Sequence, residues 1–320
     1  MPEALPDTAL ASSLQHRLNL GSAPIALPPK GMAHAHFRLP GGALARVPRW
    51  SQIGLDPAAN LAHQATAFTR AAPSGHTPKL LGTLAPGPDL PMGALLVEEI
   101  SGRPPRLSED FPAIAKALAA IHALPSEPAP NPITSTVQVI ERQAPYFAKA
   151  NLAPETLSHL NAELEWVRTL PTTPAPPITL VGTDTHPGNF LIDADGKAWF
   201  VDLEKATDGL AAIDLAHATL YTSTTWDPDV AAVLTPAETA SFYETWSQTA
   251  PPAVVESTRP WFTPARRLTW LRTLSWMARW KVEGSTIHSA GVDPRTLTHV
   301  QARIEDFFDP NTIAQVRATL

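Results

Sequence analysis

Residues 179–204 constrain the fold of this chain more than any other stretch. A β-rich run leads into a polar loop, and two further apolar runs flank an Asp-Gly pair at 195–196. Asp-Gly between two such runs is a strong hairpin signal. The pattern therefore predicts three short buried strands, which carry the polar side chains of Asp184, Asn189 and Asp202 at their ends.

The order and spacing of these polar residues match the needs of phosphoryl transfer. An Asp has to orient or deprotonate the attacking hydroxyl, while Asn and Asp side chains hold Mg²⁺ on the nucleotide phosphates. Four residues separate Asp184 from Asn189, and Asp202 follows at the end of the hairpin. Protein kinases use the same order. We therefore predict Asp184 as the catalytic base, and Asn189 and Asp202 as Mg²⁺ ligands.

Three linked motifs resemble the aminoglycoside phosphotransferase and choline kinase superfamily. They are Asp-x-His-Pro-Gly-Asn at 184–189, Val-Asp-Leu-Glu at 201–204 and Ile-Asp-Leu-Ala at 213–216. The resemblance implies a two-lobed, protein-kinase-like α+β fold, with a small β-rich nucleotide-binding lobe over residues 1–100 and a mostly helical catalytic and substrate-binding lobe over 101–320. It also implies that Asp214 supports the catalytic loop. Glu204 would help to order Mg²⁺ directly or through water, and the alternative is a surface Glu.

The resemblance also suggests nucleotide contacts in the N-terminal lobe. Gly31 lies in a turn that would let backbone N–H groups approach the phosphates, although an ordinary hairpin is the alternative. Arg46 falls where the family places a cation on the α and β phosphates, and the alternative is an exposed strand residue. Gln64 aligns with the Glu that normally pairs with this cation, so it can hydrogen-bond Arg46 without forming an ion pair. Backbone groups around Glu98, Glu99 and Ile100 would bind the nucleotide base.

The pattern of apolar residues, with Pro and Gly as breaks, predicts the remaining elements. Strands are predicted at 23–27, 33–39, 43–47, 78–84, 94–100, 178–181, 190–192 and 198–201. Helices are predicted at 7–19, 56–71, 108–123, in two stretches within 134–170, and at 213–223, 236–248, 260–283 and 294–308.

Two departures from the family motifs favour a second hypothesis. Gly182 stands where the family has a loop histidine, and Gln64 replaces a Glu. The alternative function is therefore a nucleotide-binding pseudokinase or ligand sensor with lost or weak catalysis. A third hypothesis is a metal-dependent hydrolase that uses Asp184, His186 and Asp202, which requires these residues to surround one metal. We interpret His186 as a packing or hydrogen-bonding residue of the loop, and His122 as a packing residue.

The C-terminal helices leave the acceptor open among aminoglycoside-, amino alcohol- and sugar-like compounds. Aromatic faces bind quaternary ammonium groups, but a Trp stripe is more often core, and we predict core for most of these residues. They are Trp246, Trp261, Trp270, Trp276 and Trp280. Carboxylates in the same region would suit amino groups, although such residues usually form a solvated face. They are Asp227, Asp229, Glu238, Glu244 and Glu283.

Composition limits the other function classes. The net charge of −6 provides no basic footprint for nucleic acid. The chain has no Cys, so disulfides, thiolate metal sites and cysteine nucleophiles are excluded. No apolar run approaches the roughly 20 residues that span a bilayer, and the N-terminal residues do not resemble a secretory signal. We therefore expect a cytoplasmic kinase that uses ATP or GTP with Mg²⁺, without a nucleic-acid or membrane partner.

Overall fold

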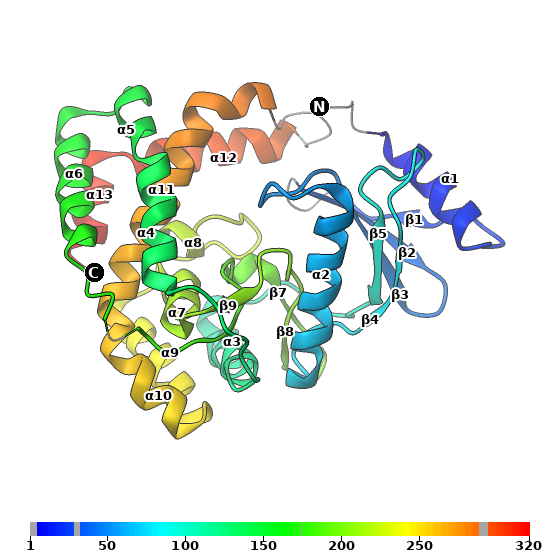
Figure 1. Cartoon of the computed structure of the whole chain (residues 1–320), viewed down its shortest axis with the longest axis horizontal. Helices are drawn as coiled ribbons and strands as arrows, with labels where there is room; N and C mark the ends of the chain where they lie inside the picture. Colours follow the sequence, from blue (N-terminus) through cyan, green and yellow to red (C-terminus); the bar gives the residue numbers. More distant parts are fainter. Residues whose placement is uncertain (1–4, 29–32, 174, 288–293) are drawn as a thin grey trace.

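The computed structural model describes residues 5–28, 33–173, 175–287 and 294–320. Its N-terminal part contains a five-stranded antiparallel sheet, and the rest of the chain is mostly helical (Figure 1). The predicted α+β class, with a small β-rich N-terminal part and a helical C-terminal part, is therefore confirmed.

The sheet has the strand order β1-β2-β3-β5-β4, and each neighbouring pair is antiparallel. Its strands are β1 (Ile25–Ala26), β2 (His34–Leu39), β3 (Ala43–Pro48), β4 (Leu80–Leu84) and β5 (Ala94–Glu98). All five strands predicted for this part are present. Strand β1 is shorter than predicted, and β5 ends at Glu98 rather than at Ile100.

Two helices accompany the sheet, α1 (Asp7–Arg17) and α2 (Pro57–Ala71). Helix α2 begins after Asp56, whose side chain accepts a hydrogen bond from the Ala59 N–H, as expected of an N-cap residue. Helix α2 lies between the sheet and the helical part, with the side chain of Phe68 fully buried (Figure 1).

The helical part follows the predicted order with two additions, and the first of the two stretches predicted within 134–170 is divided into two helices at Ala144. Its helices are α3 (Leu107–His122), α4 (Pro132–Gln143), α5 (Pro145–Lys149), α6 (Pro154–Arg168), α7 (Ala211–Thr219), α8 (Tyr221–Thr224), α9 (Pro236–Thr249), α10 (Pro252–Thr258), α11 (Phe262–Ile287), α12 (Pro294–Phe307) and α13 (Pro310–Arg317). Helices α10 and α13 were not predicted. The helix predicted at 213–223 is divided because Leu220 has extended backbone angles. Among the residues that the structure describes, no helix is both long and apolar enough to cross a bilayer.

The central hairpin forms as predicted. Strands β7 (Phe190–Ile192) and β8 (Ala198–Phe200) pair in antiparallel register. The predicted strand at 178–181 is β6 (Thr179–Val181), but its partner is β9 (Thr207–Gly209), a short strand that the sequence analysis missed. The loop between β6 and β7 is thus held at both ends by short strand pairs.

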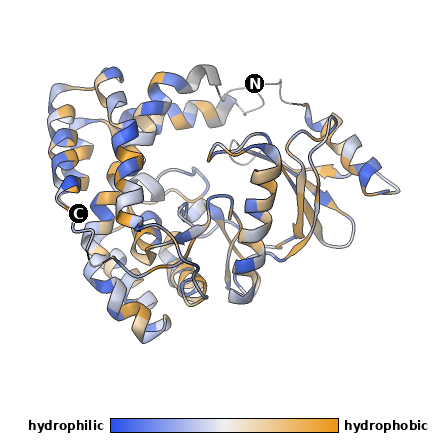
Figure 2. Cartoon of the chain, viewed as in Figure 1, coloured by the Kyte–Doolittle hydropathy of each residue, from blue (hydrophilic) through white to orange (hydrophobic). Residues whose placement is uncertain are grey.

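An apolar cluster joins the two parts of the molecule. It includes Phe68 of α2, Leu95 of β5, Phe111 of α3, and Phe190 and Phe200 of the central hairpin. Figure 2 shows apolar residues along the sheet strands and along the helix sides that face one another. Each fully buried side chain of this size contributes on the order of 2 kcal/mol of hydrophobic free energy. This shared core fixes the hairpin against the sheet.

Most of the C-terminal Trp residues lie in the core, as predicted. Trp246, Trp270 and Trp280 are all less than a tenth exposed. Trp261 and Trp276 are partly buried against a second cluster formed by the C-terminal helices.

Candidate active site

A strained residue precedes Asp184. Thr183 has φ 59°, a left-handed conformation that is rare for a β-branched residue. The Thr183 N–H donates to Asp214 Oδ1 (2.8 Å), and the Thr183 hydroxyl donates to the Lys205 carbonyl (2.9 Å). The Thr183 carbonyl accepts from Arg272 Nη2 (2.8 Å). These three hydrogen bonds hold the strained backbone in place and so fix the position of the neighbouring Asp184 Cα.

Asp214 anchors the loop from α7, which agrees with its predicted supporting role. Its side chain is fully buried and accepts a second hydrogen bond from the Gly182 N–H at 2.7 Å. His122 Nε2 lies 3.1 Å from Asp214 Oδ2, and Trp246 Nε1 donates to His122 Nδ1 at 3.0 Å. His122 is fully buried against the Trp246 ring, as expected of a packing residue, and it also joins a chain of hydrogen bonds behind the loop.

The carboxylate of Asp184 is paired with a lysine. Lys205 Nζ donates to Asp184 Oδ2 at 2.5 Å, and His217 Nε2 of α7 lies 3.8 Å from Oδ1. Burial acts to raise the pKa of Asp184, but the charge and hydrogen bond of Lys205, together with the neighbouring His186 and His217, outweigh burial and hold this pKa well below its usual range. Burial lowers the pKa of His217 to about 3, so this imidazole is neutral near pH 7.

Arg46 is buried against Asp202. Its side chain donates from Nη2 to Asp202 Oδ1 and from Nη1 to the Val201 carbonyl, both at 2.7 Å. Because Arg46 is only 4% exposed, the alternative of an exposed strand residue is wrong. The expected hydrogen bond between Arg46 and Gln64 is also wrong, since Gln64 lies against His34 instead, with 3.4 Å between Gln64 Oε1 and His34 Nε2. A charged guanidinium prefers the carboxylate because such hydrogen bonds are stronger than those to a neutral amide.

Glu204 is buried, so the alternative of a surface Glu is wrong. It is 4% exposed, and its carboxyl group accepts a hydrogen bond from Gln52 Nε2. His34 Nδ1 of β2 lies 3.7 Å from Glu204 Oε2. Burial and the neighbouring Asp202 raise the pKa of Glu204 to about 8. Burial and Arg46 lower the pKa of His34 to about 4.

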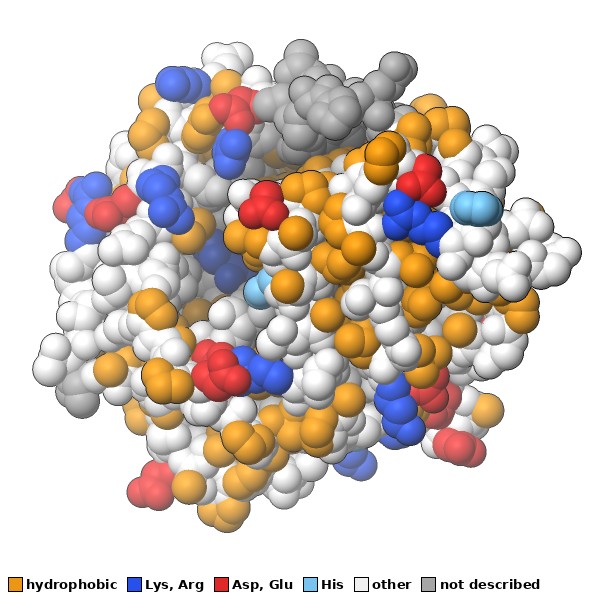
Figure 3. Space-filling view, turned by 45° about the vertical axis from the view of Figure 1, so that its right-hand side comes forward, with side chains coloured by type: hydrophobic (Ala, Val, Ile, Leu, Met, Phe, Trp, Pro, Cys, Tyr) orange, Lys and Arg blue, Asp and Glu red, His pale blue; other side chains and the backbone are white. Residues whose placement is uncertain are grey.

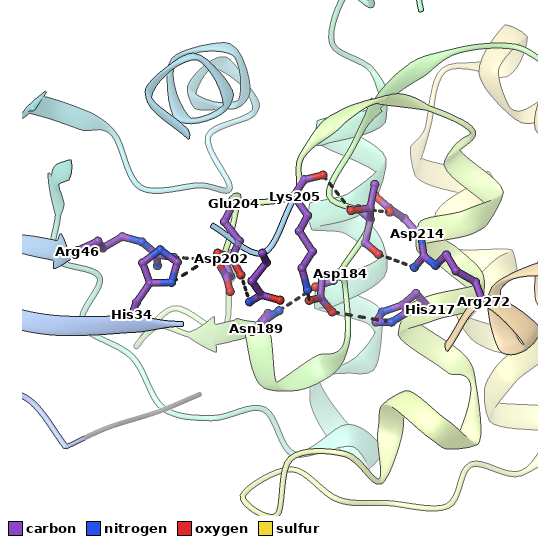
Figure 4. A network of polar contacts seen from close by, with 12 residues as sticks. His34, Arg46, Asp184, Asn189, Asp202, Glu204, Lys205, Asp214, His217 and Arg272 are labelled. Carbon is purple, nitrogen blue, oxygen red and sulfur yellow. Dashed lines mark hydrogen bonds and ion pairs between the residues drawn. The ribbon is translucent and has the colours of Figure 1, made fainter. Parts of the chain in front are cut away.

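The side chains predicted to bind Mg²⁺ lie near one another in the site (Figure 4). Asn189 sits between Asp184 and Asp202 and donates from Nδ2 to the Asp184 carbonyl at 2.8 Å, which leaves its amide oxygen for other contacts (Figure 4). Hard cations such as Mg²⁺ prefer carboxylate and amide oxygens. The oxygen atoms of Asn189, Asp202 and Glu204 therefore have the chemistry that Mg²⁺ requires.

The hydrolase hypothesis required Asp184, His186 and Asp202 to surround one metal. Within the described ranges, the group of close metal-ligating side chains is instead His34, Asp202 and Glu204. The trio that this hypothesis needs is therefore not assembled.

The other predicted nucleotide contacts lie at the end of β5. The Glu98 and Glu99 N–H groups already donate to the carbonyls of Lys79 and Gly42. The side chain of Glu99 also accepts from Arg38 Nε at 2.6 Å, and that of Glu98 from the Lys79 N–H at 3.3 Å. Ile100 follows directly. The remaining predicted contact, in the turn at 28–31, falls at Gly31, outside the described residues.

Several site residues escaped the sequence analysis. Lys205 directly follows the Val-Asp-Leu-Glu motif, so its position was the one available signal. His34, His217 and Arg272 come from β2, α7 and α11, and no local pattern connects them with the loop.

Figure 3 shows a hollow in the surface between the sheet-containing part and the helical part, with basic and histidine side chains inside it.

Comparison with known proteins identifies the family. The family model for the phosphotransferase enzyme family matches residues 40–251, which include the whole loop and hairpin. The chain belongs to this family. This match confirms the family resemblance that was inferred from the three motifs of this phosphotransferase. A search of curated proteins found no match.

Solved structures share the fold of this phosphotransferase at low sequence identity. A choline/ethanolamine kinase family protein from Mesorhizobium loti is 19% identical, with a TM-score of 0.60 over 98% of this chain and 99% of that one. The GDP complex of aminoglycoside 2'-phosphotransferase-IIIa is 13% identical, with a TM-score of 0.64 over 96% and 100% of the two chains. The ADP-bound aminoglycoside phosphotransferase APH(2'')-Ib is 12% identical, with a TM-score of 0.57 over 96% and 99%. The protein-kinase-like fold predicted from the sequence is thus confirmed.

Proposed function

We propose that this phosphotransferase moves the γ-phosphoryl group of ATP or GTP to a hydroxyl group of an aminoglycoside-, amino alcohol- or sugar-like acceptor. The observation that carries the proposal is the line of Asp184, Asn189 and Asp202 in one site, on a loop whose backbone is anchored from three sides (Figure 4). The ADP and GDP complexes of similar structures support a nucleotide as the donor.

In the proposed reaction, Asp184 takes the proton of the acceptor hydroxyl while the new phosphorus–oxygen bond forms. The bond between the γ-phosphorus and the bridging oxygen breaks, and the nucleoside diphosphate leaves with that oxygen. Asn189, Asp202 and Glu204 would hold Mg²⁺, which neutralises charge on the transferred group when it is bound. Lys205 has to leave the Asp184 carboxylate for the proton to be accepted there.

We assign nucleotide binding to the N-terminal lobe, residues 1–100, and acceptor binding to residues 101–320. Arg46 would exchange Asp202 for the nucleotide phosphates, where its guanidinium can form two hydrogen bonds. The Ile100 N–H has no hydrogen-bond partner among the described residues, so it is the backbone donor left for the base. Gly31 keeps its proposed place over the phosphates. The cytoplasmic location remains a prediction from the sequence.

One observation favours the alternative of a nucleotide-binding sensor. The ion pair between Lys205 and Asp184 occupies the proposed base, and an enzyme that had lost catalysis could keep such a pair permanently. Turnover separates the two functions, because a sensor binds nucleotide without forming a phosphorylated product.

The first experiment is thermal unfolding with ATP or GTP, each with and without Mg²⁺, followed by aminoglycosides, choline, ethanolamine and amino sugars. A ligand at about 100 times its dissociation constant stabilises the folded state by roughly 2.7 kcal/mol. We expect a shift that requires both nucleotide and Mg²⁺, a further shift with one acceptor, and product formation with that acceptor. No response to either nucleotide would contradict the proposed function, and binding without product would support the sensor.

A further inference from the structure

A histidine lies among the proposed metal ligands. One ligand atom each from His34, Asp202 and Glu204 lies within 4.8 Å of the other two. His34 is at the start of β2, whereas the two acidic residues follow β8, so the sheet and the hairpin meet at this point (Figure 4). The side chains of His34 and Glu204 are buried, at 4% and 3% exposed, whereas that of Asp202 is 23% exposed.

The contacts of the His34 ring determine which nitrogen faces the carboxylates. Nε2 lies 3.4 Å from Gln64 Oε1, and a carbonyl oxygen can only accept a hydrogen bond, so Nε2 carries the proton. Nδ1 then presents a lone pair, and it lies 3.7 Å from Glu204 Oε2, too far for a hydrogen bond. Metal-binding histidines typically donate their other ring N–H in this way to a neighbouring acceptor, which fixes the ring orientation.

Asp202 can take part in the same group although it is paired with Arg46. The guanidinium contacts Oδ1, and Oδ2 has no hydrogen-bond donor among the described residues. Ligand atoms of Asp202, Glu204 and His34, one from each, thus converge at one place.

We infer that His34 is a ligand of the divalent cation held by Asp202 and Glu204, with Gln64 as the residue that orients its ring. A site with one imidazole nitrogen beside carboxylate oxygens takes Mn²⁺ in preference to Mg²⁺, because Mg²⁺ favours oxygen ligands more strictly. The inference rests on the metal-binding role proposed for Asp202 and Glu204, but it does not depend on phosphoryl transfer. It also explains Gln64, whose uncharged amide accepts from the ring without adding a third negative charge.

The test is pulsed electron paramagnetic resonance of Mn²⁺ added to the full-length protein, alone and with ADP. We expect nitrogen modulation from a directly bound imidazole, and this signal should change to that of ¹⁵N when the histidines are labelled with ¹⁵N. His34→Gln should abolish the modulation and weaken Mn²⁺ binding at least about tenfold, and Gln64→Leu should weaken it about tenfold while the modulation remains. His63→Gln is the matched control, because the His63 ring contacts only the backbone carbonyl of Glu204 and its loss should leave the modulation intact.

Three results would overturn the inference. The first is bound Mn²⁺ without histidine modulation in the unmodified protein, which would mean that the proton is on Nδ1 and the ring bonds to Glu204. The second is unchanged modulation in His34→Gln. Absence of Mn²⁺ binding with and without ADP would overturn the metal-binding roles of all three residues. Phosphoryl transfer with Mg²⁺ is measured separately on the same protein. If product forms but bound Mn²⁺ shows no nitrogen modulation, the proposed function stands and His34 is not a metal ligand.

Discussion

Lys205 and Gly182 show how single residues of this chain differ from the motifs that surround them. Lys205 pairs with the carboxylate of Asp184. The space beside the Cα of Gly182 is occupied by Phe200 and Thr185. A Cβ added at Gly182 would lie 2.6 Å from the Phe200 ring and 2.9 Å from the Thr185 methyl group. A side chain at position 182 would therefore collide with Phe200 and Thr185.

Asp184→Asn tests the proposed base. We expect kcat to fall by about 10²–10⁴-fold, because general base catalysis contributes that much, while nucleotide affinity changes little. Steady-state kinetics and nucleotide titration measure the two effects. Asp193→Asn, in the hairpin turn, is the control that should keep its turnover. Full turnover by Asp184→Asn would remove Asp184 from the mechanism.

Gly182→Ala tests the close approach of Phe200. The added methyl group should destabilise the protein by about 1–3 kcal/mol, the usual range for overpacking. Denaturant unfolding measures this change. Gly21→Ala is the matched control, because no heavy atom lies within 4 Å of a Cβ built there, and it should change stability by less than about 0.5 kcal/mol. Equal stabilities for the two variants would show that the loop tolerates a side chain at position 182.

At the scale of elements, three helices hold the loop between β6 and β7. Helix α7 provides Asp214, α3 provides His122 behind it, and α9 provides Trp246 behind His122. Since the indole N–H donates to His122 Nδ1, the imidazole is neutral with its proton on Nε2, which donates to Asp214. This buried chain of hydrogen bonds transmits the position of the helices to the backbone of Gly182 and Thr183.

His122→Leu tests this chain. The substitution leaves the Trp246 N–H without its acceptor and removes one of the two hydrogen bonds to Asp214 Oδ2, which should destabilise the protein by about 1–3 kcal/mol. It should also lower kcat without weakening nucleotide binding, because the loop loses its support.

The control for this prediction is Thr156→Val, which removes a buried hydrogen bond to the Phe308 carbonyl far along the chain. It should lower stability by a similar amount and leave kcat unchanged. If both variants lose kcat in proportion to stability, the His122 chain has no specific role in the loop.

At the scale of the whole molecule, an ion pair connects the two parts. Arg70 of α2 donates from Nη1 and Nη2 to the two carboxylate oxygens of Asp208 in β9, at 2.6 and 2.8 Å. Asp208 also accepts from the Glu127 N–H at 2.8 Å. The hydrogen bonds from Arg70 lower the pKa of Asp208 below its ordinary value of 3.8. The pair therefore fixes α2, which flanks the sheet, to the segment that follows Lys205.

The pH dependence of stability tests this connection. A carboxyl group with a lowered pKa in the folded state stabilises the protein above its unfolded pKa and loses this contribution as the pH falls towards its folded pKa. Asp208→Asn should therefore be about 1–2 kcal/mol less stable than the unmodified protein at pH 7. The difference in stability between the two proteins should shrink as the pH falls below about 4. Denaturant unfolding curves recorded at pH 7 and below pH 4 measure it. A difference that is constant with pH would mean that the charge of Asp208 is not what stabilises the connection.

Local sequence signals are sufficient to predict the hairpin and the order of Asp184, Asn189 and Asp202. These residues lie within one short stretch, where turn chemistry and the alternation of strands bring them together without help from distant segments. The same local signals predicted the main helices, since apolar spacing and Pro breaks act within a single element. They missed β9, which has only three residues and forms because β6 lies beside it.

Packing between distant segments selects the side chains that surround that loop. Arg46 pairs with Asp202 rather than with Gln64, and His34 reaches Glu204, because the sheet packs on the hairpin through the shared apolar core. Lys205 and Arg272 meet the loop for the same reason, since packing rather than local pattern brings separate elements together. Contacts between distant segments depend on the geometry of the packed core, which no single stretch of sequence encodes.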